Sequence, residues 1–308
     1  MPMISVIIPT ARRPQLLMRA VNSVLAQSMS DLEVVVVIDG PDPETTQILS
    51  GVADHRFRFI QNPRSLGSAE ARNVGVAAAR GEWVAFLDDD DEWLRHKLEL
   101  QLLAAGPVDQ FIIVSCLSYV VTPLRRYIWP HRVYDNDSPL DEYLFDRRTW
   151  FRGDVMLQSS SLLMPRQLCL ALMFTPDHDD WDMLLRAVKA KGAKIVSVTE
   201  PLVLHYTEEA RDSLGASFDW RKSLKWADSN RSIISPRAYA GFCLTVVSPQ
   251  PAKAGDYFAF FVLAYRAFCY GSPRPIHLAL YLAIWLIPTR WRQQLRSIWQ
   301  RPPQPLNV

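Results

Sequence analysis

Cysteine is scarce in this chain, and its placement argues against two classes of protein. The four cysteines are widely separated, with no C-x-x-C pair and no cysteine–histidine ligand pattern; they are Cys116, Cys169, Cys243 and Cys269. A disulfide framework or a structural zinc site would need closer or more regular spacing. We therefore expect reduced thiols and a cytoplasmic protein.

Long apolar runs and a strong net charge are also missing. No stretch reaches the roughly 18 uninterrupted apolar residues of a membrane-spanning helix. Met1 to Ser5 carry no basic region leading into a signal-peptide core, so we expect the protein neither to be secreted nor to cross a bilayer. The formal net charge of +2 gives no global field, so nucleic acid is not an expected partner.

Glycine-rich phosphate loops are absent from the N-terminal region. No G-x-G-x-x-G follows the first apolar run, Ile4 to Ile8, which argues against a dinucleotide-dependent oxidoreductase. A nucleotidyltransferase that makes an activated sugar would be expected to carry a glycine-rich, basic loop near the same run, and the sequence has none. Both enzyme classes are therefore poorly supported.

What the chain does contain is an alternation of short apolar runs with amphipathic segments. The runs read as buried strands, each ending in polar or acidic residues; they are Ile4 to Ile8, Val34 to Ile38, Phe57 to Ile60 and Trp83 to Leu87. Helices are predicted between these strands. Ser68 is expected to cap one of them, and residues 92–105 are expected to form another. This order predicts an α/β fold with a mixed, mostly parallel sheet and helices on both faces.

The most informative segment is the run of four aspartates from Asp88 to Asp91, directly after the strand predicted at Trp83 to Leu87. Adjacent carboxylates raise one another's pKa unless a cation lies between them. An all-oxygen cluster suits Mg²⁺ or Mn²⁺, and these ions favour phosphate-bearing ligands. The alternative is a solvated acidic turn that opens a helix.

In this order, the segments resemble the family 2 glycosyltransferases of the GT-A fold, from Ile4 to about Tyr206. The resemblance is carried by Ser5 to Arg13, Ala20 to Ser28, Glu33 to Gly40, Gly67, Ala71-Arg72-Asn73, Gly75, Gly81, Leu87 to Trp93 and Lys97 to Glu99. The chain departs from the family pattern where Arg12 replaces an asparagine, Ile38 an aspartate and Pro41 a serine.

The resemblance implies a transferase that takes a sugar from a nucleotide-diphosphate-sugar donor. The residues implied to bind this donor are Pro9, Thr10, Arg13, Asp39, Arg72, Asp88 and Asp89. Asp39 would accept a hydrogen bond from the base, although it could also be a simple turn acid. Arg13 and Arg72 suit a diphosphate because guanidinium binds phosphate through two parallel hydrogen bonds, and Arg12 competes with Arg13 for this role.

The family's Asp-x-Asp falls on Asp88 and Asp90. Asp90 is implied as the direct ligand of Mn²⁺ or Mg²⁺, while Asp88 and Asp89 would hold the ribose or metal-bound waters. The metal would neutralise charge on the departing diphosphate. Asp91 is assigned instead to capping the helix expected near Glu92.

A second acidic segment, Asp177 to Asp182, matches the family position of the catalytic base. Inverting transfer needs a general base to take the proton of the acceptor hydroxyl. The resemblance implies Asp180 in this role, with Asp179 the neighbour most easily confused with it. The alternative is acids placed favourably at a helix N-terminus. His178 and His205 are given no role, because lone histidines usually satisfy local hydrogen bonds.

The chain is expected to divide at about Gly215. Residues 1–215 would form the catalytic domain, with a nucleotide-sugar-binding half over about 1–105 and an acceptor half over about 106–215, and 216–308 a helical extension. No acidic residue follows Asp256, whereas six arginines do: Arg266, Arg274, Arg290, Arg292, Arg296 and Arg301. Aromatic helices flanked by arginine suit a membrane interface, or they pack on the catalytic domain or in a dimer.

Two functions from different classes fit the sequence. The first is an inverting glycosyltransferase that acts on a glycan or lipid-linked acceptor, in cell-surface polysaccharide synthesis at the cytoplasmic face of the membrane. The second is a non-catalytic nucleotide-sugar-binding or scaffolding member of the family, suggested by the departures at Arg12, at Ile38 and at His205, where the family more often has an aromatic residue. Neither the donor sugar nor the oligomeric state follows from the sequence.

Overall fold

The structure is a computed structural model that describes residues 3–106, 111–123, 125–150, 155–207, 219–288 and 291–292. The chain forms two compact units, the first built from Met1–Asp135 with Leu157–Glu209 and the second from Asn136–Met156 with Ala210–Val308. Segment 136–156, placed in the acceptor half by the sequence, therefore groups with the second unit. The boundary expected at 215 lies outside the described residues.

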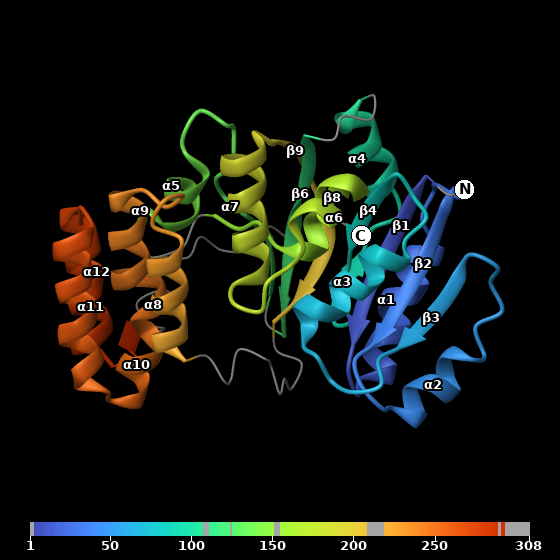
Figure 1. Cartoon of the computed structure of the whole chain (residues 1–308), viewed down its shortest axis with the longest axis horizontal. Helices are drawn as coiled ribbons and strands as arrows, with labels where there is room; N and C mark the ends of the chain where they lie inside the picture. Colours follow the sequence, from blue (N-terminus) through green and yellow to red (C-terminus); the bar gives the residue numbers. More distant parts are fainter. Residues whose placement is uncertain are drawn as a thin grey trace. The chain divides into compact units, whose positions relative to one another are not determined.

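The first unit is built on one sheet whose strand order is β3-β2-β1-β4-β8-β6-β9-β5, with β7 paired to β6 (Figure 1). Its strands are β1 (Ile4–Thr10), β2 (Leu32–Ile38), β3 (Phe57–Gln61), β4 (Trp83–Phe86), β5 (Glu92–Trp93), β6 (Ile112–Thr122), β7 (Arg125–Trp129), β8 (Leu163–Pro165) and β9 (Lys194–Tyr206). Strands β1 to β4 are parallel, as are β6 and β9, while β8, β7 and β5 pair antiparallel. The predicted mixed, mostly parallel sheet is confirmed.

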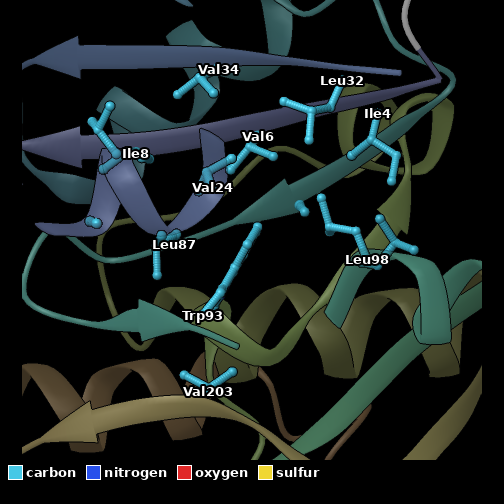
Figure 2. Close-up of a cluster of buried hydrophobic side chains, with 14 of the residues drawn as sticks. Ile4, Val6, Ile8, Val24, Leu32, Val34, Leu87, Trp93, Leu98 and Val203 are labelled. Atoms are coloured by element: carbon cyan, nitrogen blue, oxygen red, sulfur yellow. The ribbon is translucent and has the colours of Figure 1, made fainter. Parts of the chain in front are cut away.

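Helices cover both faces of this sheet. The first unit contains α1 (Pro14–Leu25), α2 (Pro43–Leu49), α3 (Ser68–Ala78), α4 (Lys97–Ala105), α6 (Arg166–Leu172), α7 (Asp179–Lys191) and the 3-10 turn η1 (Ser159–Ser161). Ile4, Val6 and Ile8 of β1 join α1 and α4 in the main hydrophobic cluster (Figure 2). On the opposite face, Val35 and Val37 of β2 pack against α3. Because side chains alternate along a strand, both faces of the parallel strands are apolar.

Three local predictions around these helices are wrong. The helix expected over 92–105 begins only at Lys97, because Glu92–Trp93 pairs with β9 instead and buries the Trp93 indole in the main cluster. Asp91 therefore does not cap a helix. Ser68, expected as a cap, is the first residue of α3, and Gly67 occupies the N-cap position.

Gly75 lets α3 approach β1 closely, and this contact supports a stability prediction. A Cβ atom at this position would lie 2.4 Å from Cγ2 of the buried Ile7 side chain. Overpacking of this kind costs about 1–3 kcal/mol, so Gly75→Ala should lower the free energy of unfolding by that amount in urea denaturation. At Gly51, where an added Cβ would be 3.4 Å from its nearest neighbour, the same substitution should change stability by less than about 0.5 kcal/mol. Equal effects at the two sites would contradict the packing argument.

The second unit is helical. It contains α5 (Leu140–Phe145), α8 (Trp220–Ser229), α9 (Pro236–Gly241), the π-helical segment η3 (Phe242–Val247), α10 (Pro249–Ala254), α11 (Tyr257–Tyr270) and α12 (Pro275–Leu286). Rings of Phe145, Trp226 and Phe242 pack together in its core. Over the described ranges, no helix has both the length and the apolarity needed to cross a membrane.

Candidate active site

Asp89 and Asp90 lie just beyond β4, at the sheet edge where β1 also ends. Thr10 Oγ1 donates to Asp89 Oδ2 over 2.7 Å. Arg13, the residue before α1, places Nη1 3.3 Å from Asp89 Oδ1 and 3.4 Å from Asp90 Oδ2. Four of the residues predicted to bind the donor or metal are thus brought together by two strand ends and one helix start.

Asp91 takes a different direction from its neighbours. Its side chain is buried, with Oδ2 accepting from Ser160 Oγ over 2.7 Å and Oδ1 2.9 Å from Nδ1 of His205 on β9. Both carboxylate oxygens are therefore engaged inside the protein. The pair links the acid run, Asp88 to Asp91, to β9, a contact that local sequence patterns do not predict.

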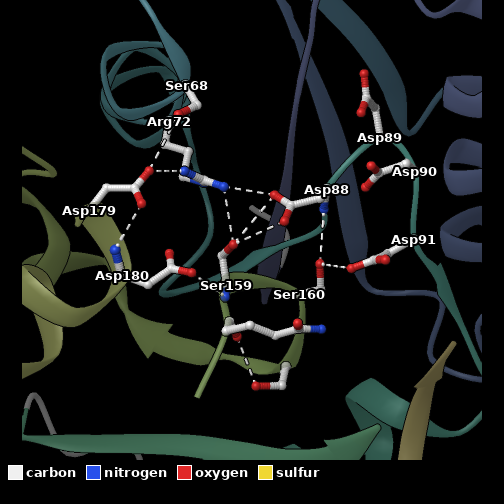
Figure 3. A network of polar contacts seen from close by, with 12 residues as sticks. Ser68, Arg72, Asp88, Asp89, Asp90, Asp91, Ser159, Ser160, Asp179 and Asp180 are labelled. Atoms are coloured by element: carbon white, nitrogen blue, oxygen red, sulfur yellow. Dashed lines mark hydrogen bonds and ion pairs between the residues drawn. The ribbon is translucent and has the colours of Figure 1, made fainter. Parts of the chain in front are cut away.

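Arg72 on α3 connects the two acidic segments (Figure 3). Its buried guanidinium donates from Nη2 to Asp88 Oδ1 over 2.7 Å and to Ser159 Oγ over 3.1 Å, and from Nη1 to Asp179. Its predicted contact with the donor would therefore compete with carboxylates it already binds. In this structure Arg72 holds together acids that are separated by about ninety residues of chain.

Asp180 lies beside this cluster at the start of α7. Its Oδ2 accepts from the backbone N–H of Ser159 over 3.0 Å, whereas Oδ1 is buried and has no hydrogen-bond partner among the described residues. Burial and the neighbouring Asp179 carboxylate raise the pKa of Asp180 to about 7, although Arg72 lowers it. A carboxylate with such a pKa can accept a proton near neutral pH.

Asp39 does not join the acid cluster. Its carboxylate accepts from the side chains of Asn62 and Ser65 and from the backbone N–H groups of Leu66 and Gly67, over 2.7–3.1 Å. Partial burial raises its pKa, but these four donors outweigh that effect and leave the pKa below its usual value. Asp39 thus holds the loop before α3, and its contact with a nucleotide base stays a prediction.

The remaining sequence positions are explained by backbone geometry and packing. Pro9 lies buried within β1, paired with Val37, and its donor contact also stays a prediction. Arg12, in place of the family's asparagine, has a left-handed φ of 59° and donates its N–H to Asp42. Asparagine tolerates that conformation better than arginine does. Ile38, in place of the first acid, is fully buried in the main cluster.

The charge balance of this site fits a hard divalent cation. Five carboxylates gather around Arg13 and Arg72; they are Asp88, Asp89, Asp90, Asp179 and Asp180. Burial raises the pKa of Asp89 to about 6 despite Thr10 and Arg13. Within the described ranges no three acidic, histidine or cysteine side chains are arranged to hold a metal alone. A cation here would complete its shell with ligand and water oxygens, as Mg²⁺-type sites commonly do.

Comparison with known proteins gives this site a family. The family model described as glycosyl transferase family 2 matches residues 5–168, which is more than half of the 308 residues. The chain belongs to glycosyl transferase family 2. This membership confirms the predicted resemblance and makes the protein a glycosyltransferase.

Relatives and solved structures agree with the family. The putative colanic acid biosynthesis glycosyl transferase WcaA of Escherichia coli (strain K12) is 27% identical over 215 residues, which are 67% of this chain and 74% of WcaA. The amylovoran biosynthesis glycosyltransferase AmsB of Erwinia amylovora is 24% identical over 254 residues, 76% and 82% of the two chains. The crystal structure of S. aureus TarS 1-349 in complex with UDP-GlcNAc is similar with a TM-score of 0.63 at 16% identity, covering 96% of this chain and 92% of that chain. At this identity the likeness shows the fold, and it confirms the GT-A prediction.

Proposed function

We propose that this family 2 glycosyltransferase moves a sugar from a nucleotide-diphosphate-sugar to an acceptor hydroxyl with inversion, and that Asp180 is the general base. The observation that carries the proposal is the buried Asp180 Oδ1, which has no hydrogen-bond partner among the described residues. A buried carboxylate oxygen is rarely left without a donor, and a bound hydroxyl would supply one. The second oxygen is held in place by Ser159 N–H.

In the proposed step, the acceptor oxygen forms a bond to the anomeric carbon as the bond from that carbon to the diphosphate oxygen breaks. The diphosphate leaves with the electron pair, and the hydroxyl proton passes to Asp180 Oδ1. Asp180 must be ionised to accept this proton, and its raised pKa makes it a better base than an exposed aspartate. The second candidate, a non-catalytic binding protein, would gain nothing from this arrangement.

We assign the acid run to the donor. Thr10, Arg13, Asp88 and Asp89 would contact the nucleotide, and Asp90 would hold a divalent cation, either Mn²⁺ or Mg²⁺. Such a cation supplies charge compensation for a leaving diphosphate when it is bound. The similar structure of the mannosyltransferase PcManGT from Pyrobaculum calidifontis, in complex with GDP-Man and Mn²⁺, supports this assignment (TM-score 0.50, 18% identity, 96% of this chain and 73% of that chain).

A thermal-shift panel of UDP, GDP and their sugars, with and without Mn²⁺, tests the donor assignment. One nucleotide should raise the melting temperature, since a ligand at about 100 times its Kd stabilises a protein by roughly 2.7 kcal/mol. Asp90→Asn should lose the part of this shift that depends on Mn²⁺. Asp31→Asn, at the opposite edge of the sheet before β2, should retain it. A panel without any shift would refute nucleotide-sugar binding.

We further infer that the acceptor is carried at a membrane surface and that the second unit contacts this surface. One side of α11 exposes large apolar side chains, each more than half accessible; they are Tyr257, Phe258, Phe261, Tyr265 and Phe268. Phe260 of α11 stacks on Tyr281 of α12, which lies beside it (Figure 1). Tyrosine, phenylalanine and arginine in this arrangement suit the lipid interface. The relatives named for colanic acid and amylovoran biosynthesis support a role in polysaccharide biosynthesis, and we place this role at the cytoplasmic face.

Vesicle flotation tests the membrane contact. The protein should float more with vesicles of phosphatidylcholine and phosphatidylglycerol, mixed at about 7:3 by moles, than with vesicles of phosphatidylcholine alone, because arginines attract anionic lipid. Replacing Phe258, Phe261 and Tyr265 together with serine should reduce binding by at least about tenfold, since each buried aromatic contributes roughly 1.5–3 kcal/mol. Leu103→Ser, which removes an equally exposed apolar residue from α4, is the control. Unchanged flotation of the triple variant would exclude this face.

A further inference from the structure

Strand β7 and the segment just after it carry a row of cationic and aromatic side chains, which we call the β7 stripe: Arg125, Tyr127 and Trp129 of the strand, and His131 beyond it. The Arg125 guanidinium lies 5.3 Å from the centre of the Tyr127 ring. The Tyr127 and Trp129 rings are 6.2 Å apart, and Trp129 is 4.8 Å from the His131 ring. Arg125, Tyr127 and Trp129 share a face because alternate residues of a strand do, and the ring contact between Trp129 and His131 extends this surface.

Arg125 forms no ion pair with any carboxylate among the described residues. In the part of the chain that the structure describes, no carboxylate lies within 4.0 Å of its guanidinium. The same holds for Arg126, which lies on the other face of β7 over the Tyr119 ring, at 3.4 Å from its centre. The strand therefore presents one cation to each side of the sheet.

The pairing register places the β7 stripe on the sheet face to which His205 of β9 points. Val120 of β6 is paired with Tyr127 on one side and with His205 of β9 on the other. Residues paired in this way point to the same face, and neighbouring strands lie about 4.8 Å apart. Tyr127 is thus two strands from His205, which contacts Asp91 of the acid run.

We propose that the β7 stripe binds the acceptor, with Tyr127 and Trp129 stacking on a sugar ring and Arg125 pairing with an anionic group of the same molecule. Aromatic faces bind the apolar faces of sugar rings, and guanidinium binds carboxylate or phosphate through two parallel hydrogen bonds. The anionic group is either a carboxylate on an acidic sugar or the diphosphate of a lipid-linked sugar. This inference rests on the proposed glycosyl transfer, because it names the substrate class for the same site.

Binding of defined saccharides by calorimetry tests the proposal. The probes are trigalacturonate, which carries carboxylates; farnesyl-diphospho-N-acetylglucosamine, which carries a diphosphate; and the neutral maltotriose. The full chain is first saturated with Mn²⁺ and the nucleotide that stabilises it, so that a probe cannot occupy the donor site. We expect one anionic probe to bind at least about tenfold more tightly than maltotriose. The probe that binds identifies the source of the charge.

Matched substitutions locate the binding site. Arg125→Gln and Trp129→Ala should each weaken binding by about tenfold. Arg126→Gln removes the same charge from the opposite face, and Trp150→Ala removes an exposed tryptophan from another segment. Both should leave binding within about twofold.

Three results would overturn the inference while leaving the proposed function intact. They are failure of both anionic probes to bind the nucleotide-loaded protein, equally tight binding of maltotriose, and a loss of binding in Arg126→Gln as large as that in Arg125→Gln. Failure of the protein to bind any nucleotide would instead refute the proposed function, and with it this inference.

Discussion

Asp180→Asn is expected to reduce sugar transfer by about 10²- to 10⁴-fold, the range typical for loss of a general base. The amide keeps the shape of the side chain but cannot accept the acceptor proton. Donor affinity should not fall, because Asp180 is bound by Ser159 and not by Thr10 or Arg13. Release of nucleoside diphosphate, measured with acceptor or with water as acceptor, reports transfer, and the thermal shift reports donor binding.

The pH profile gives the same prediction an independent readout. Since the pKa of Asp180 is raised to about 7, kcat/KM of the wild-type enzyme should fall about tenfold per unit as the pH drops below that value. Asp177→Asn, an exposed acid in the same segment, should preserve both rate and profile. Full activity in Asp180→Asn would show that the protein uses another base, whereas an inactive wild-type chain that binds donor would favour the non-catalytic alternative.

Arg72→Met is expected to lower the free energy of unfolding by about 3 kcal/mol and to abolish transfer. Removing one partner of a buried ion pair leaves the other charge uncompensated, which costs about 3–5 kcal/mol when both are buried. Asp88 and Asp179 are partly exposed, with side chains 35% and 25% accessible, so the lower end applies. Urea denaturation at about pH 7.5, above the pKa of Asp180, measures the change in the free energy of unfolding.

A surface pair supplies the comparison for Arg72. Arg237 lies 3.3 Å from Glu142 with its side chain 44% accessible, and exposed pairs of this kind contribute about 0–1 kcal/mol. Arg237→Met should therefore change stability little and leave donor binding intact. If Arg72→Met were no more destabilising than Arg237→Met, the central position given to Arg72 would be wrong.

Much of the donor side of the site could be predicted from local sequence. A buried strand followed by acids places those acids at the carboxyl edge of a parallel sheet, and this reasoning correctly brings Thr10, Asp89 and Asp90 together. The fold could also be predicted, because the apolar runs and helical periodicities are strong in the first hundred residues. Asp180 could be singled out only through the family resemblance.

The hydrogen bonds and ion pairs that cross the site could not be predicted from local sequence patterns. Ser159 and Ser160 bind Asp180, Asp88 and Asp91, yet a serine triplet between two segments has no periodicity that distinguishes it from a loop. The pairing of Asp91 with His205 joins residues 114 positions apart. It depends on β5, a two-residue strand that the helical pattern of the following residues conceals. Such contacts follow from tertiary pairing rather than from propensity.

The position of Arg72 between Asp88 and Asp180 has a thermodynamic consequence. Its positive charge favours the ionised form of Asp180, so a bound diphosphate that attracts this guanidinium would increase the proton affinity of Asp180. Donor binding would then be accompanied by proton uptake, and by reciprocity the donor would bind more tightly in slightly acidic solution. The heat of donor binding should accordingly vary with the ionisation enthalpy of the buffer.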